Sequence, residues 1–290
     1  MRPSGLPLPP LLGFTRMADL VTPSGESQPL ATAEVVVRET SALVSTSSTG
    51  AAFAKPIVAN KGAGAFRLDP STLESKAGAL CRAVSNTDYL FQEAIHQHDG
   101  MSALYPYSLN TLRVLVGKRP GSPATPLSVI VRTGSDGRPV DNAHAGGIFV
   151  GVDLETGRLK KHGHQLYSFG GKRFMTHPDT GLAFDGYVVP RFDEVMDVVL
   201  RAHEWMPHPY SGWDIGITPE GPVIVECNPG PYVLMMDVAH GGLKADPIFR
   251  YYLSSQGVLR PGRSPRVSWP MASPATCRRR GTSLVPIVYP

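Results

Sequence analysis

Residues 212–231, GWDIGITPEGPVIVECNPGP, restrict how this chain can fold more than any other stretch of the sequence. Residues 213–217 alternate large apolar side chains with small or polar ones, a turn containing proline and glycine follows at 218–222, and residues 223–225 form a β-branched run. This pattern predicts a β-hairpin made of two adjacent strands.

The hairpin carries three oxygen donors. In a strand successive side chains face opposite sides, so Glu226 and Asn228 share a face, and the turn brings Asp214 back beside them. Two carboxylates and an amide oxygen form a hard ligand set that suits Mg²⁺ bound together with phosphate. We therefore predict that Asp214, Glu226 and Asn228 bind one or two Mg²⁺ ions, with Mn²⁺ as a substitute. An exposed hairpin with solvated carboxylates would show the same pattern.

A glycine-rich stretch, AFAKPIVANKGAGAFRLD at residues 52–69, is the candidate phosphate-binding segment. Gly62 and Gly64 would let backbone amides approach an anion closely, and Lys55 would neutralise phosphate charge. The GxxxxGK[ST] pattern is absent, so an ordinary turn remains the alternative.

Residues 87–117 contain an apolar strand that ends in Gln92-Glu93-Ala94-Ile95 and a second strand that carries Arg113. The order of Lys-Pro with a glycine loop, this Gln-Glu segment, the arginine strand, Asn-His-x-Gly-Gly and the Asp…Glu-x-Asn hairpin is similar to the ATP-grasp superfamily from about residue 50 to 245. More narrowly, the chain resembles the sugar-transfer-associated ATP-grasp family, which is related to alpha-L-glutamate ligases. The motifs that carry the resemblance are NTLRV (110–114), DNAHAGGIFVGVD (141–153), HPDTG (177–181) and the hairpin.

This resemblance implies an α+β fold in which two α+β subdomains clamp ATP between antiparallel sheets, preceded by a truncated N-terminal domain. The expected divisions are an N-terminal segment at 1–50, a smaller subdomain at 51–95, a larger subdomain with the metal site at 96–250, and a flexible basic tail at 251–290.

The resemblance also implies roles for individual residues. Adenine would bind the segment from Gln92 to Ile95, here called the hinge. The phosphates would bind Lys55 and the glycine loop. Arg113 would stabilise the transferred phosphoryl group, and the loop at 142–147 would hold the acceptor or an acyl phosphate. His144 is either a proton acceptor or a solvated loop histidine. The implied catalytic residues are Arg113, Asn142 and His144, and the implied ATP-binding residues are Lys55, Gly62, Gly64, Gln92, Glu93, Ala94, Ile95, Gly146 and Gly147.

The implied activity is that of an ATP-dependent ligase that joins a small-molecule carboxylate to an amine or another nucleophile. The reaction would pass through an acyl phosphate and release ADP and phosphate, in polysaccharide or small-metabolite biosynthesis. Two alternatives remain open: an ATP-grasp kinase of a small alcohol or sugar, and a non-catalytic nucleotide-binding protein.

Composition limits the partners. The 290 residues are 42% hydrophobic and have a net charge of +4, but residues 251–290 contain six arginines and no acidic residue. The remainder therefore has a net charge of −2, which argues against nucleic acid as a partner. No apolar run reaches membrane-spanning length, and three scattered cysteines indicate a reducing, cytoplasmic location. The oligomeric state is left open.

Four local predictions complete the analysis. We expect a strand at 33–38, a helix at 69–84 capped by Ser71, and a helix at 191–205 whose apolar stripe packs on a sheet. Cys227, which lies between two expected metal ligands, should face away from the metal as a small core residue.

Overall fold

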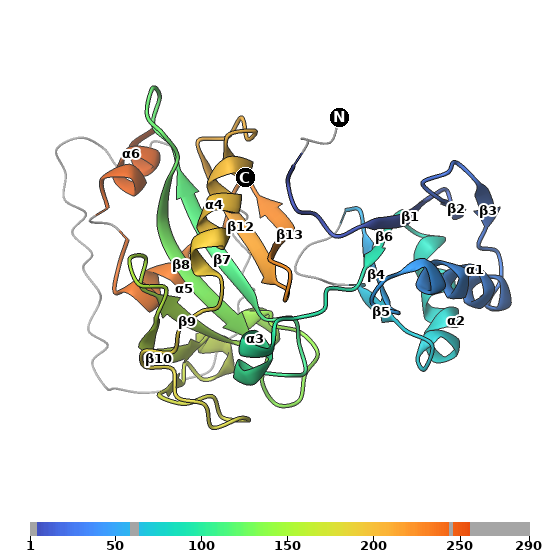
Figure 1. Cartoon of the computed structure of the whole chain (residues 1–290), viewed down its shortest axis with the longest axis horizontal. Helices are drawn as coiled ribbons and strands as arrows, with labels where there is room; N and C mark the ends of the chain where they lie inside the picture. Colours follow the sequence, from blue (N-terminus) through green and yellow to red (C-terminus); the bar gives the residue numbers. More distant parts are fainter. Residues whose placement is uncertain (1–4, 59–63, 244–245, 256–290) are drawn as a thin grey trace, which may run out of the picture.

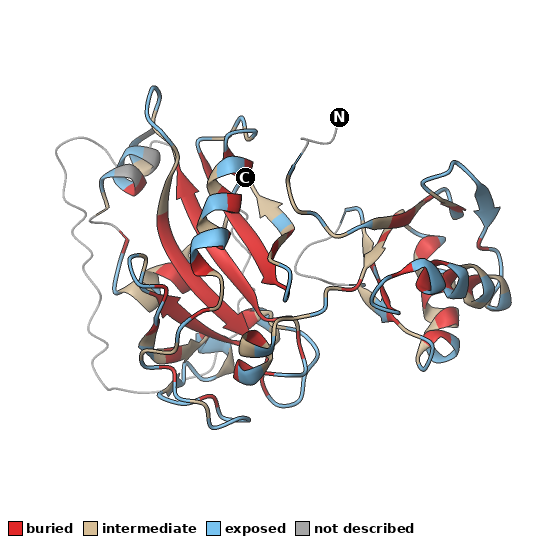
Figure 2. Cartoon of the chain, viewed as in Figure 1, coloured by how far each residue is buried: buried red, intermediate tan, exposed pale blue. Residues whose placement is uncertain are grey.

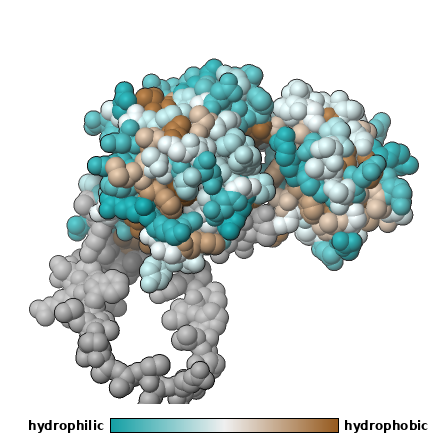
Figure 3. Space-filling view, turned by 90° about the horizontal axis from the view of Figure 1, so that it is seen from below, coloured by the Kyte–Doolittle hydropathy of each residue, from teal (hydrophilic) through white to brown (hydrophobic). Residues whose placement is uncertain are grey.

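The computed structural model describes residues 5–58, 64–243 and 246–255. They form two lobes, each built on its own antiparallel sheet (Figure 1). We call residues 11–93 the small lobe and residues 99–255 the large lobe. In the space-filling view the two lobes are distinct masses, and hydrophobic residues are scattered over the visible surface (Figure 3).

The small lobe contains a six-stranded sheet in the order β3-β2-β1-β6-β4-β5, with two helices packed on it. The strands are β1 (Leu11–Arg16), β2 (Asp19–Val21), β3 (Ser27–Pro29), β4 (Ala52–Pro56), β5 (Phe66–Leu68) and β6 (Tyr89–Glu93), and the helices are α1 (Ala33–Thr46) and α2 (Leu73–Val84). Residues from before and after position 50 thus share one sheet and one core.

The large lobe contains a seven-stranded sheet in the order β11-β10-β9-β8-β7-β12-β13. Its strands are β7 (Thr111–Gly117), β8 (Thr125–Thr133), β9 (Ile148–Val152), β10 (Leu159–Gln165), β11 (Arg173–Phe174), β12 (Tyr210–Ile217) and β13 (Pro222–Asn228). Its helices are α3 (Asp99–Leu104), α4 (Phe192–His203), α5 (Leu234–His240) and α6 (Pro247–Ser255), with short turns η1 (Ala143–Ala145) and η2 (Tyr167–Phe169).

The two faces of the large sheet have different neighbours. On β7, Leu112, Val114 and Val116 belong to the core that packs against α4, whereas Leu115 belongs to a second core under α5 and α6. Because side chains alternate along a strand, Arg113 lies on the second face. The central strands of this sheet are buried along their length (Figure 2).

The structure confirms the α+β class with two antiparallel sheets and the hairpin at 212–231. It also confirms the long amphipathic helix, which runs as α4 and buries Phe192, Val195 and Val199 against the sheet. None of the described helices is long and apolar enough to cross a membrane.

One local prediction was wrong, and another was wrong only in where the helix begins. The strand expected at 33–38 is the start of helix α1, because Val36, Thr40, Leu43 and Val44 recur at helical spacing and outweigh the local β preference of three consecutive valines. Thr32 caps this helix, accepting a hydrogen bond from the Val35 N–H.

The helix expected at 69–84 begins only at Leu73, after Thr72. Ser71 does not cap it, because the Ser71 hydroxyl donates to the Asp69 carboxylate instead. The flexible tail was expected at 251–290, but residues 251–255 are the end of helix α6. The rest of that segment lies outside the described residues.

Candidate active site

The β12–β13 hairpin places the predicted oxygen donors on one face of the large sheet, opposite α4. Asp214 pairs with Glu226 across the hairpin, and Gly212 pairs with Asn228. Asp214 is buried, Glu226 is exposed and Asn228 is half-buried. The three side chains therefore differ in access to solvent although they lie in neighbouring register positions.

Two arginines hold the carboxylate of Asp214. Arg113 lies directly across from it on β7 and binds both carboxylate oxygens, through Nε to Oδ1 and through Nη2 to Oδ2 at 2.6 Å. Arg132, on β8, donates from Nη2 to the same Oδ2 at 3.1 Å. Burial alone would raise the pKa of Asp214, but attraction to Arg132 and hydrogen bonds from Arg113 outweigh it and keep the pKa below its usual value.

Arg132 also connects this pair to a second, partly buried carboxylate. It donates to the Thr111 hydroxyl from Nη2 at 2.7 Å and from Nε at 3.1 Å, and it lies 3.4 Å from Asp141. Thr111 in turn donates to Asp141. Burial raises the pKa of Asp141, and the attraction of Arg132 only partly offsets this effect. Two guanidinium groups and two carboxylates thus form one buried network, here called the arginine cluster (Arg113, Arg132, Asp141, Asp214 and Thr111).

Sequence reasoning identified Arg113 and Asp214 but missed the other members of the arginine cluster. A signal for Arg132 was present, since it is a charged residue directly after the β-branched run Val129-Ile130-Val131. Asp141 directly precedes Asn142 in a motif already singled out. Neither signal shows which partner each side chain meets.

Lys55 reaches from the small lobe to the hairpin of the large lobe. It extends from β4, and its ammonium donates to the Val225 carbonyl at 3.2 Å. Burial lowers the pKa of Lys55, and the nearby Glu226 carboxylate opposes this shift. Lys55, the predicted phosphate-binding lysine, therefore lies near Glu226, a predicted metal ligand, although the two residues belong to different lobes.

The glycine loop is described only at its end. Gly62 lies outside the described residues. Gly64 has a φ of +77°, and its carbonyl accepts a hydrogen bond from the Tyr89 hydroxyl at 2.8 Å. A Cβ at Gly64 would lie 3.0 Å from the Tyr89 hydroxyl oxygen, so glycine suits the position sterically as well as conformationally.

The hinge segment leaves the small sheet at the end of β6, which contains Gln92 and Glu93. The N–H of Glu93 donates to the Pro10 carbonyl at 2.9 Å, and the N–H of Ala94 donates to the Ala51 carbonyl at 3.0 Å. The Glu93 carboxylate accepts hydrogen bonds from Ser48. Within the described residues, the N–H of Ile95 has no main-chain acceptor.

The loop that carries Asn142 and His144 folds over the end of β8. Asn142 caps turn η1 and accepts a hydrogen bond from the His144 N–H at 3.0 Å. The ring of His144 lies 5.8 Å from the ring of Tyr232, in the segment between β13 and α5. His144 is exposed, and it lies three residues along the chain from Asp141 of the arginine cluster.

The loop itself requires both of its glycines. Gly146 ends η1 with a φ of +92°. A Cβ on Gly147 would lie 2.7 Å from the carbonyl oxygens of Asp141 and Thr133, closer than side-chain carbons approach backbone oxygens. These contacts give Gly146 and Gly147 a structural reason that does not depend on a bound nucleotide.

Three further residues of interest are packing residues. Cys227 packs against the core under α4, as predicted, and burial raises the pKa of its thiol to about 11. His203 is buried and bonds the Ser211 hydroxyl at 2.8 Å. His177 is buried in the turn after β11, where Nε2 lies 3.0 Å from the Gly134 carbonyl.

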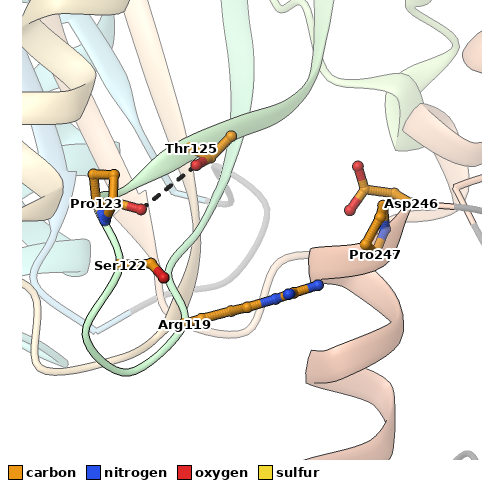
Figure 4. Close-up of a pocket in the computed structure, with 6 residues that line it drawn as sticks. All are labelled: Arg119, Ser122, Pro123, Thr125, Asp246 and Pro247. Atoms are coloured by element: carbon orange, nitrogen blue, oxygen red, sulfur yellow. Dashed lines mark hydrogen bonds between the residues drawn. The ribbon is translucent and has the colours of Figure 1, made fainter.

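A cavity of about 320 Å³ lies at the far end of β7 from Arg113, between the β7–β8 loop and the start of α6 (Figure 4). Arg119 extends across it towards Asp246 and Pro247. It contains none of the predicted site residues.

The donor set can be tested for its fit to a metal ion. The described residues contain no group of three His, Cys, Asp or Glu side chains arranged to hold one. Glu226 is exposed, so its carboxylate is accessible. The amide nitrogen of Asn228 is a buried donor without an acceptor among the described residues, and a metal ion would not satisfy it. Asp214 uses both lone pairs of Oδ2 and one of Oδ1 for the arginines. The oxygens left for a metal are therefore the Glu226 carboxylate and the Asn228 amide oxygen, with Asp214 contributing at most its remaining lone pair.

Comparison with known proteins adds a family match. A family model described as sugar-transfer associated ATP-grasp matches residues 71–245, which is more than half of the chain. No curated protein matches the chain.

Several solved structures are similar at low identity. The chain is similar to a D-alanine–D-alanine ligase from Bacillus anthracis (11% identity, TM-score 0.45, covering 88% of this chain and 65% of that one). It is also similar to a D-alanyl-alanine synthetase A from Vibrio cholerae (13% identity, TM-score 0.44, covering 87% of this chain and 56% of that one). A third similar structure is the ATP-grasp ligase PsnB complexed with a phosphomimetic variant of minimal precursor, Mg and ADP (14% identity, TM-score 0.42, covering 83% of this chain and 50% of that one). The chain thus spans between half and two thirds of the length of these proteins.

Proposed function

The chain belongs to the sugar-transfer associated ATP-grasp family, and from that premise we propose that it is an ATP-dependent ligase that joins a small-molecule carboxylate to an amine or another nucleophile. The arginine cluster is the observation that carries the proposal. It puts two buried guanidinium groups beside the hairpin that bears Glu226 and Asn228. Such a site suits the negative charge of a phosphoryl group during its transfer.

ATP would bind between the two lobes. Adenine would meet the hinge at Gln92 to Ile95, with the N–H of Ile95 as a donor, and the phosphates would meet Lys55 and the loop that contains Gly62 and Gly64. The position of Lys55 supports this arrangement, because its ammonium already lies at the edge of β13.

Glu226 and Asn228 would hold Mg²⁺ or Mn²⁺, with a smaller contribution from Asp214. When bound, such an ion offsets charge on the phosphate oxygens of the nucleotide. The main role of Asp214 would then be to hold Arg113 and Arg132 in place, because it forms an ion pair with each of them.

The reaction that this site supports has two steps. An oxygen of the substrate carboxylate attacks the γ-phosphorus of ATP, the bond from that phosphorus to ADP breaks, and an acyl phosphate forms. The nucleophile then attacks the acyl carbon, phosphate leaves with the electron pair of the C–O bond, and the nucleophile loses a proton. Arg113 and Arg132 would stabilise the phosphoryl charge. Asn142 and His144, in the loop that follows Asp141, would position the acceptor, with His144 able to take the proton.

The test is to incubate the protein with ATP, Mg²⁺ and pairs of small carboxylic acids and amines, and to identify the nucleotide product. We expect ADP and inorganic phosphate in amounts that match the amide formed. AMP and pyrophosphate would contradict the acyl-phosphate route, and a stable phosphorylated product would favour a kinase.

The same preparation allows the metal assignment to be measured without turnover. Calorimetric binding of ADP should become tighter when Mg²⁺ is added to the wild type, and Glu226→Gln should abolish that gain. Glu220→Gln, which removes an exposed carboxylate in the turn of the same hairpin, is the matched control and should behave as the wild type does.

A further inference from the structure

Among the described residues, two segments join the lobes. One connection is the hinge that follows β6, where the His98 N–H donates to the Ile217 carbonyl at 2.8 Å. The other is the segment Gly5-Leu6-Pro7-Leu8-Pro9-Pro10, here called the N-terminal strap (residues 5–10). In Figure 1 it is the dark blue trace that runs from beside β13 to β1.

Each end of the N-terminal strap is attached to a different lobe. Leu6 packs against the large-lobe core under α4, and the Pro7 carbonyl accepts a hydrogen bond from the Ile224 N–H of β13 at 2.9 Å. Three residues later the Pro10 carbonyl accepts from the Glu93 N–H at 2.9 Å. The chain then enters β1, where Leu12 is buried in the small-lobe core.

The proline content of the strap fits this position. β13 is the edge strand of the large sheet, so its outward N–H groups need acceptors. Pro7 and Pro10 have no N–H of their own and offer only carbonyls. Proline also keeps the segment extended and reduces the conformational entropy lost when it is held between two bodies.

The N-terminal strap and Lys55 both form hydrogen bonds with β13, the edge strand of the large sheet. Ile224 binds the strap, Val225 accepts from the Lys55 ammonium, and Glu226 is the next residue along β13. A movement of β13 away from the small lobe would therefore break the strap contact and the lysine contact together.

We propose that the N-terminal strap is a tether that limits separation of the two lobes and keeps Lys55 against the hairpin of the candidate active site. The tether itself stands on contacts within the chain. Its effect on nucleotide affinity rests on the proposed function.

Hydrogen exchange at the Ile224 amide measures the tether directly, without any nucleotide. Leu6→Asp should detach the strap from the large-lobe core, and the triple change Pro7→Gly, Pro9→Gly, Pro10→Gly should loosen it while leaving the apolar anchor intact. Each should speed exchange at Ile224 by about tenfold. Leu8→Asp is the control, because Leu8 is 46% exposed and should leave exchange unchanged.

A second measurement tests the consequence for the site. The calorimetric Kd for Mg·ADP should rise by about five- to tenfold in Leu6→Asp and in the triple glycine variant, and not in Leu8→Asp. Wild-type rates of Ile224 exchange in both strap variants would overturn the tether. An unchanged Kd despite faster exchange would overturn its role in nucleotide binding. If the wild type bound no Mg·ADP, the proposed function would fail, and the exchange result would still decide the tether.

Discussion

At the scale of single residues, the arginine cluster is an arrangement in which each charge depends on the others. Arg132 lies between two carboxylates, the partly buried Asp141 and the buried Asp214. Both favour its charged form, since their attraction outweighs the cost of burial and raises the pKa of Arg132. A carboxylate left without a cation in such surroundings would be strongly destabilised.

Arg132→Gln should therefore lower the free energy of unfolding by about 3–5 kcal/mol, because it removes the cation that the buried Asp214 shares with the partly buried Asp141. Urea unfolding followed by circular dichroism measures the change. Arg201→Gln, on the exposed face of α4, is the matched control and should stay within about 0.5 kcal/mol of the wild type. Equal effects of the two substitutions would show that the cluster does not stabilise the fold.

At the scale of elements, the loop between β8 and β9 is defined by close backbone packing. Gly147 lies against the carbonyls of Thr133 and Asp141, and Asp141 is also a member of the arginine cluster. The conformation of this loop and the position of a buried charge are thus coupled.

Gly147→Ala should destabilise the protein by about 1–3 kcal/mol, because its Cβ would force the loop away from backbone atoms that cannot yield as a flexible side chain would. Gly230→Ala is the control, since a Cβ there meets nothing within 4 Å. Thermal unfolding of both variants tests this, and a Gly147→Ala protein as stable as Gly230→Ala would show that the loop adapts freely.

At the scale of the whole molecule, Lys55 makes the free energy of unfolding depend on the contact between the lobes, because its ammonium is partly buried where it meets β13. Burial lowers its folded pKa below the value in the unfolded chain, so the folded state holds this proton less tightly. The cost of keeping Lys55 charged is fully present below the folded pKa. It disappears as the pH rises through that pKa towards the unfolded value near 10.5.

We therefore expect the wild type to gain stability relative to Lys55→Met as the pH rises from 7 towards about 10.5, because only the wild type loses the cost of the buried charge. Urea unfolding of both proteins across that range measures the difference, in which the other titrating groups cancel. A difference that stayed constant with pH would mean that Lys55 is as well solvated in the folded state as in the unfolded chain.

Local pattern was sufficient for the parts of this protein whose physical cause lies within a few residues. Alternation and a Pro/Gly turn predicted the β12–β13 hairpin, and the shared face of Glu226 and Asn228 follows from strand geometry alone. The stripe on α4 likewise predicted its burial. Where two local tendencies compete, as in Ala33 to Thr46, the longer-range helical spacing prevailed over three valines and the sequence-based prediction was wrong.

The sequence by itself thus determined the hairpin, the amphipathic helix, the α+β class and, through its motifs, the family. Tertiary structure alone decided that Arg113 and Arg132 share Asp214, since these residues are 101 and 82 positions away from it in the chain. It alone decided that residues 5–10 run between the lobes. The physical reason is that strand register and lobe contacts depend on the packing of the whole core, whereas periodicity, turn chemistry and capping act between neighbours along the chain.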